Sequence, residues 1–125
     1  MARWLQANGP IDLCILGLGT NGHVAMNEPA LAIVAHTHTA RLAASSRRHA
    51  LLRHLPKKPT DGMTLGMGEI LWSRKILLLV SGRGKRAALE KLAEPNVTTR
   101  FPASLLWLHP DATVLCDRAA AGGIA

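Results

Sequence analysis

Two short apolar runs, each followed directly by a glycine-rich turn, constrain the fold of this chain more than any other feature of its sequence. The runs are residues 11–16 and 75–80, and the turns after them begin at Gly17 and Ser81. A continuous apolar run of this length is typical of a buried strand in a parallel sheet. We therefore predict an α/β domain with a mostly parallel sheet flanked by helices. Ligands of such sheets bind beyond the carboxyl ends of the strands, where both turns would lie.

The other segments alternate between helix and strand signals. A helix is expected over residues 86–93, directly after the second turn. Another is expected to start at Ser45 or Ser46 and to end at Pro56. The remaining expectations are a helix at 2–7, a strand within 31–39, a strand at 63–65, a helical turn at 68–72, a short helix at 102–105, a strand at 113–116 and a frayed tail at 119–125.

Length and composition indicate one domain, spanning residues 1–125. Of these residues 48% are apolar and 3% aromatic, which suits an aliphatic α/β core better than an aromatic-rich β-sandwich. The apolar runs are too short to span a bilayer, and no apolar signal segment follows Met1. Cys14 and Cys116 each lie in an apolar run, so we expect reduced core thiols. These features predict a cytoplasmic protein with no membrane partner.

Positive charge is concentrated in one part of the chain. The formal net charge is +7, and the stretch from Pro29 to Thr60 contains no Asp or Glu but six Lys or Arg residues. Such a stretch either binds an anion or forms a solvated helix face. The candidate anions are a phosphorylated metabolite and an acidic lipid, and we expect no nucleic acid, because no aromatic side chains for base stacking are interleaved with the charges.

The first turn has the spacing G-x-G-x-x-G, at Gly17, Gly19 and Gly22, which is found in dinucleotide-binding loops. That interpretation requires a long helix after the third glycine, but Pro29 comes too early. It also requires an acidic residue about twenty positions later for the ribose hydroxyls, and that part of the chain has none. We therefore favour a loop that places acid–base groups, with no nucleotide cofactor.

The second turn, "SGRGKRAAL", resembles a phosphate-binding P-loop but lacks two of its required residues. Leu79 stands where the first glycine is needed, and Arg86 follows the lysine in place of Ser or Thr. A lysine at a helix N-terminus, Lys85, still forms a sound phosphate site. His36 and His38 could in principle hold zinc, but no third ligand lies nearby in the sequence, so we predict no metal.

Four segments together resemble one family. These are "LGLGTNGHVAMNEP", "GMTLGMGEIL", "ILLLVSGRGKRAAL" and "FPASLLWLHPDATVLCD", and they occur in this order in hexosamine-6-phosphate deaminases/isomerases. The first is similar to the family signature G-x-G-x-D-G-H-x-A-F-N-E-P. Asn21 and the "PASLLWLH" stretch resemble the galactosamine-6-phosphate branch more than the glucosamine-6-phosphate branch. The related 6-phosphogluconolactonases usually lack the N-E-P continuation found at residues 27–29.

The resemblance implies a reaction in which an amino-sugar phosphate becomes a ketose phosphate and ammonia without a metal or organic cofactor. His23 matches the histidine that exchanges a proton with the ring oxygen, and Glu28 matches the carboxylate that orients it. Asn21 stands where Asp is commoner, so it can orient His23 but cannot carry charge. Lys85 matches the lysine that pairs with the sugar phosphate.

Further substrate-binding positions are implied by the same resemblance. The signature glycines Gly19 and Gly22 are assigned to substrate binding. The family also uses an arginine from the basic segment, and we favour Arg47 over the competing Arg48 and Arg53.

The chain is shorter than the family pattern. Members have an N-terminal half that supplies a phosphate loop and the carboxylate base for the C2 proton, and no matching segment is present here. We therefore expect a truncated domain, the C-terminal half of a doubly wound domain of the deaminase/isomerase type. Such a domain would form a homo-oligomer or associate with a missing N-terminal half. The alternatives are a non-catalytic phosphosugar-binding remnant, a 6-phosphogluconolactonase-like hydrolase, and a basic domain associated with nucleic acid.

Overall fold

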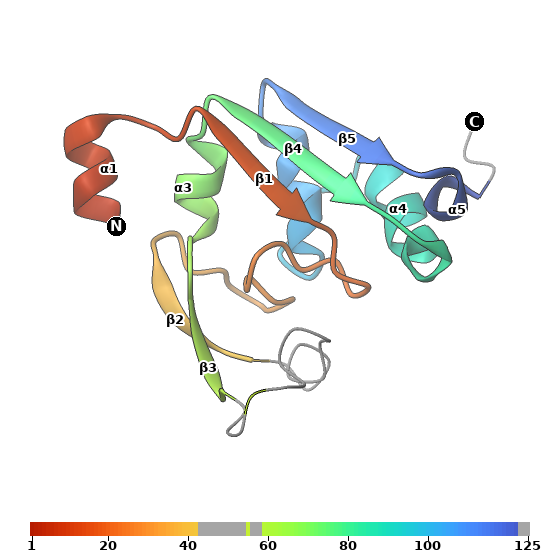
Figure 1. Ribbon diagram of the computed structural model, residues 1–125, viewed down its shortest axis with the longest axis horizontal. Helices are drawn as coiled ribbons and strands as arrows, with labels where there is room; N and C mark the ends of the chain where they lie inside the picture. Colours follow the sequence, from red (N-terminus) through yellow and green to blue (C-terminus); the bar gives the residue numbers. More distant parts are fainter. Residues whose placement is uncertain (43–54, 56–58, 123–125) are drawn as a thin grey trace.

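The computed structural model describes residues 1–42, 55 and 59–122, which form two small sheets and the helices packed on them (Figure 1). The helix predicted to begin at Ser45 or Ser46 lies almost entirely outside the described residues. The elements follow the chain in this order: α1 (Ala2–Asn8), β1 (Leu13–Gly17), β2 (His38–Arg41), β3 (Asp61–Thr64), α3 (Met67–Leu71), β4 (Lys75–Val80), η2 (Arg83–Lys85), α4 (Arg86–Ala93), η3 (Pro102–Leu108), β5 (Ala112–Cys116) and α5 (Arg118–Ala121).

The main sheet is parallel and has the strand order β1-β4-β5. In its register Ile15 lies opposite Leu77, and Leu77 lies opposite Thr113. The α/β class with a mostly parallel sheet flanked by helices is confirmed, and so are the bounds predicted for β4 and α4. The second sheet, β2 with β3, is antiparallel.

One face of the main sheet contains the core. Cys14, Leu16, Ile76, Leu78 and Val80 point from β1 and β4 into a single apolar cluster. Helices α3 and α4 lie on this side of the strands (Figure 1) and contribute their buried side chains to it, as does η3. Burial of this aliphatic surface is the main term that stabilises the fold.

The opposite face of the main sheet is bare. Leu13, Ile15, Leu79 and Leu115 are all exposed, with Ile15 at 58% and Leu115 at 60%. The prediction of a fully buried strand at residues 11–16 was therefore wrong in two respects. The strand begins two residues later, and its side chains alternate between buried and exposed. Parallel sheets normally have both faces covered, so this surface is unusual for the class.

Three other expectations also need correction. Cys14 is buried, but Cys116 is exposed, because every residue of β5 is at least partly open to solvent at the sheet edge. Of the tail expected to fray over 119–125, residues 119–121 instead belong to α5, which the Asp117 carboxylate caps, and residues 123–125 lie outside the described residues. Within 31–39 only His38 and Thr39 are in a strand.

Among the described residues, no helix is both long and apolar enough to cross a membrane.

Candidate active site

The loop after β1 crosses the carboxyl end of the main sheet and carries the predicted acid–base residues (Figure 1). Its two arms are joined by an antiparallel bridge between Leu18 and Val24, both of which are buried. Within the tip, the Gly19 N–H donates to the His23 oxygen at 2.8 Å, and the Gly22 N–H donates to the Gly19 oxygen at 2.9 Å. These bonds fix the backbone of His23 relative to the strand end.

Gly19 and Gly22 are required in this loop for steric reasons. A Cβ on Gly19 would overlap the His23 imidazole ring. Gly22 has φ +87°, and a Cβ there would overlap the ring of Phe101. Both glycines therefore let other groups approach the backbone closely, as glycines commonly do. Their predicted contact with substrate stays a prediction.

His23, Asn21 and Glu28 form one hydrogen-bonded cluster. The His23 Nδ1 and Asn21 Oδ1 atoms are 2.7 Å apart, and the Asn21 Nδ2 donates to Glu28 Oε2 at 2.7 Å. The His23 backbone N–H also donates to Asn21 Oδ1, at 3.2 Å, while Glu28 Oε1 lies 3.5 Å from His23 Nδ1. The side chains of His23 and Glu28 are 24% and 29% exposed, so solvent or a ligand can reach the cluster.

These contacts determine which nitrogen of His23 carries the proton when the ring is neutral. The ionised Glu28 carboxylate can only accept, so the Asn21 amide must present its NH₂ group to it. The Asn21 oxygen then faces His23 Nδ1, and an amide oxygen also can only accept. Nδ1 therefore carries the hydrogen, and Nε2 keeps a free lone pair that can take a proton from a substrate.

Lys85 reaches the same loop from the second glycine-rich turn. It ends η2, immediately before α4, and its Nζ donates to the backbone oxygen of Leu18 at 2.6 Å. Leu18 directly precedes Gly19, on which the His23 ring lies. The structure therefore brings the predicted ammonium and the predicted imidazole to one strand end. Arg47 and its competitors Arg48 and Arg53 lie outside the described residues.

Phe101 and Ala103 support this loop, and the sequence analysis did not identify either of them. The Ala103 N–H donates to the Gly22 oxygen at 2.8 Å, and the buried Phe101 ring packs on Gly22. The Lys91 ammonium lies 4.9 Å from the centre of the Phe101 ring, a cation–π distance. Phe101 is the sole phenylalanine in the chain, but its sequence neighbours carry no signal for this contact.

Asn27 fixes the other arm of the loop. It is buried, and its Nδ2 donates to the Val24 oxygen at 3.1 Å and to the Leu65 oxygen at 3.0 Å. The backbone N–H of Met26 also donates to Thr64 Oγ1, at 3.2 Å. The N-E-P stretch is thereby held against the segment that follows β3, which sets the position of Glu28.

The two histidines considered as zinc ligands serve other contacts. His36 Nδ1 lies 3.1 Å from Glu69 Oε1, and His38 Nδ1 lies 2.8 Å from the His36 backbone oxygen. The buried Glu69 carboxylate also accepts from the N–H groups of Thr37 and Gly66. Burial acts to raise the pKa of Glu69, but these hydrogen bonds outweigh it and leave the pKa below its usual value. Among residues 1–42, 55 and 59–122, no three His, Cys, Asp or Glu side chains are grouped to hold a metal.

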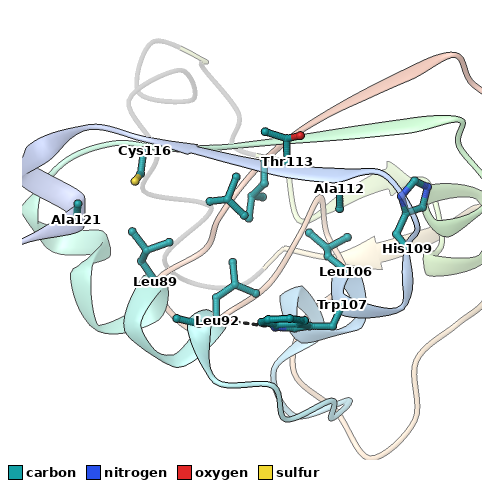
Figure 2. A pocket seen from close by; sticks show the side chains of 12 residues that line it. Leu89, Leu92, Leu106, Trp107, His109, Ala112, Thr113, Cys116 and Ala121 are labelled. Atoms are coloured by element: carbon teal, nitrogen blue, oxygen red, sulfur yellow. Dashed lines mark hydrogen bonds between the residues drawn. The ribbon is translucent and has the colours of Figure 1, made fainter. Parts of the chain in front are cut away.

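A hollow formed by described residues lies away from this cluster. It has a volume of about 390 Å³ and is bordered by β5, α4 and η3 (Figure 2). Its lining is mostly apolar, and the Trp107 indole N–H on its floor donates to the Leu92 oxygen at 2.8 Å. Its histidine, His109, has both ring nitrogens engaged, by the Ser73 oxygen and the Asp111 N–H. The hollow therefore offers no free acid–base group from that histidine, and the loop after β1 remains the candidate site.

The parallel sheet has a histidine, a carboxylate and a lysine at the carboxyl ends of its strands, the edge at which α/β domains bind their ligands. The chain belongs to the family described as glucosamine-6-phosphate isomerases/6-phosphogluconolactonase, which it matches over residues 1–115.

Individual relatives agree with this assignment. A glucosamine-6-phosphate deaminase from Bacillus velezensis is 40% identical over 124 residues, covering 97% of this chain and 51% of its own length. Glucosamine-6-phosphate deaminase 1 from Bacillus subtilis is 44% identical over 116 residues, covering 90% of this chain and 48% of its own. This chain therefore spans about half the length of the curated relatives it matches.

Solved structures show the same fold. A monomeric glucosamine-6-phosphate deaminase superimposes with a TM-score of 0.87 at 41% identity, covering 96% of this chain and 51% of its own. A 6-phosphogluconolactonase from Trypanosoma cruzi superimposes with a TM-score of 0.66 at 21% identity, covering 93% of this chain and 42% of its own. The second likeness concerns the fold alone.

Proposed function

We propose that this chain carries the ring-opening and phosphate-binding groups of a hexosamine 6-phosphate isomerase/deaminase. The single observation that supports this most strongly is the bond from Lys85 to Leu18, because it places a cation beside the loop that holds His23. The names of the relatives support an amino-sugar phosphate as the substrate class.

Lys85 would bind the phosphate of the substrate. Its compact ammonium is already oriented by the Leu18 oxygen, so little side-chain entropy would be lost when the phosphate arrives. A phosphate dianion next to this ammonium would gain a charge-assisted hydrogen bond. The sugar would then extend from the phosphate towards His23.

His23 would open the sugar ring. Its Nε2 would take the proton of the anomeric hydroxyl and return a proton to the ring oxygen as the bond from C1 to that oxygen breaks. The imidazolium formed in between would be stabilised by Glu28, whose carboxylate is 3.5 Å from Nδ1, and oriented by Asn21. The products of this step are the open-chain aldehyde and the unchanged histidine.

The later steps need a base for the proton on C2. That proton would move to C1 through an enediol-type intermediate, water would add to C2, and ammonia would leave. We infer that a segment equivalent to the other half of the relatives supplies this base and covers the bare face of β1, β4 and β5. The inference is supported by the exposed apolar residues on that face and by the share of the relatives that this chain spans.

The test is a fusion of the N-terminal half of the Bacillus subtilis relative to this chain, compared with this chain alone. Ammonia release is measured with glucosamine 6-phosphate and galactosamine 6-phosphate. The proposal predicts release by the fusion and loss of at least a hundredfold in rate with His23→Ala, in line with the usual contribution of an acid–base group. The epimer that is turned over faster identifies the branch, and the Asn21 resemblance favours galactosamine 6-phosphate.

The remaining alternatives give different results in the same samples. A phosphosugar-binding remnant would bind both epimers, and its folded fusion would release no ammonia. A lactonase-like hydrolase would instead release acid from 6-phosphogluconolactone. A control variant, Lys75→Met, removes an exposed ammonium at the opposite, amino end of β4 and should leave ammonia release unchanged.

A further inference from the structure

The carboxylate of Asp117 joins two segments that are far apart in the sequence. It lies directly after β5, where it caps α5 by accepting from the Ala120 N–H at 2.7 Å. It also accepts from the Ser81 hydroxyl at 2.7 Å and from the Gly82 N–H at 3.0 Å. Ser81 and Gly82 begin the turn that carries Lys85. A carboxylate that only capped α5 would need its contact to Ala120 but not its contacts to Ser81 and Gly82.

The path from this carboxylate to Lys85 is short. The Gly82 N–H is held by Asp117, and the Gly82 oxygen accepts from the Lys85 N–H at 3.0 Å. Gly82 has φ +91° and precedes the single turn of η2. Two hydrogen bonds therefore connect Asp117 to the backbone of Lys85, whose ammonium in turn reaches Leu18.

We propose that Asp117 is a positioning residue for phosphate binding, which it supports by fixing the Ser81–Gly82 turn and hence the direction of Lys85. This inference rests on the proposed function, because it assumes that Lys85 binds the substrate phosphate. Asp117 itself would not touch the substrate, since a carboxylate would repel a phosphate dianion. Its negative charge is instead engaged by the Ser81 hydroxyl and by two backbone N–H groups.

The two carboxylate oxygens allow the two roles of Asp117 to be separated. Ser is about as good an N-cap as Asp, so Asp117→Ser should keep α5 capped. Its single short hydroxyl cannot also reach Ser81 and Gly82, so the turn is released. Ser81→Ala removes one contact to the turn and leaves the cap intact.

The experiment measures the dissociation constant of glucosamine 6-phosphate for the 125-residue chain and its variants by calorimetry. We expect Asp117→Ser to weaken binding about tenfold and Ser81→Ala about twofold, because the first variant loses the contacts to both Ser81 and Gly82 and the second loses only one of them. Protection of the Ala120 amide from hydrogen exchange is measured in each variant, and it should persist in Asp117→Ser.

A double-mutant cycle with Lys85→Met shows whether Asp117 acts through Lys85. If it does, Asp117→Ser should weaken the remaining affinity less than twofold in the Lys85→Met background. An equal loss in both backgrounds would overturn the inference, because a general structural effect does not depend on Lys85. If Asp117→Ser binds the sugar phosphate as tightly as the wild-type chain does, the inference is wrong but the proposed function stands. A wild-type chain that does not bind the sugar phosphate would overturn the proposed function together with the inference.

Discussion

The ammonium of Lys85 donates to the backbone oxygen of Leu18 across 67 residues of sequence. This bond links the turn after β4 to the loop after β1, the two strand ends that are neighbours in the parallel sheet. It explains how two glycine-rich turns, separate in the sequence, contribute to one site. The predictions below concern the groups around this junction and the sheet that supports it.

Replacing Asn21 by Asp should move the NMR titration midpoint of His23 to higher pH. A carboxylate 2.7 Å from Nδ1 would stabilise the imidazolium, whereas the present amide oxygen carries no net charge. The midpoint is followed through the ring signals of His23, and His38, whose Nδ1 contacts a backbone oxygen, serves as the internal control. An unchanged midpoint for His23 would contradict the contact.

A methyl group on Gly19 should displace the His23 ring. Gly19→Ala is expected to lower the free energy of unfolding by about 1–3 kcal/mol, the usual cost of overpacking, and to abolish ring opening. Gly17→Ala is the matched control, since a Cβ at Gly17 meets nothing within 4 Å. Urea unfolding measures the free energy for both variants. Equal stability of the two would contradict the packing described here.

The Glu69 carboxylate should stabilise the fold at neutral pH but not in strong acid. The pKa of Glu69 is lowered in the folded protein. Its contribution to the free energy of unfolding is therefore complete above the pKa of the unfolded state, and it disappears as the pH falls through the pKa of the folded state. His36 Nδ1 lies 3.1 Å from the same carboxylate, so this contact also depends on the charge of Glu69.

Unfolding of the wild type and of Glu69→Gln is therefore compared from pH 7 to pH 3. We expect a difference of about 2 kcal/mol at pH 7, because the carboxylate accepts several hydrogen bonds, and a smaller difference at pH 3. If the difference in unfolding free energy between the two proteins grows as the pH falls, the pKa of Glu69 is raised by folding and not lowered.

The bare face of the main sheet should make the isolated chain associate. Ile15 and Leu115 expose apolar surface on the two outer strands of this face, and such surface favours self-association. Ile15→Lys should reduce the associated fraction in sedimentation velocity. Leu31→Lys, at a loop residue that is 82% exposed, should leave it unchanged. A clean monomer of the wild-type chain would contradict this expectation.

The sequence predicted correctly those elements and groupings that are determined by residues close together in the chain. The apolar run of β4 and the helix after its glycine turn were placed at their observed bounds, because a continuous apolar run and a glycine-rich turn mark the strand end and the helix start there. His23, Asn21 and Glu28 were placed in one loop by a signature in which all three are within eight residues, so the geometry of the loop brings them together.

Contacts between distant segments could not be predicted in the same way. Nothing near Phe101 indicates that its ring packs on Gly22, since this contact depends on the position of η3 against the sheet. The exposure of Ile15 was missed because an apolar run does not show which of its faces is covered. Cys116 was expected in the core for the same reason.

The central claim is that one sugar phosphate contacts both His23 and Lys85. The most direct measurement is an NMR titration of the isotope-labelled chain with glucosamine 6-phosphate, following the His23 ring and the Lys85 ammonium. Both signals should shift along curves that give the same dissociation constant, and both shifts should disappear with the unphosphorylated sugar. If either group keeps its signal at saturation, or the two curves give different constants, then these residues do not share one ligand and the claim is wrong.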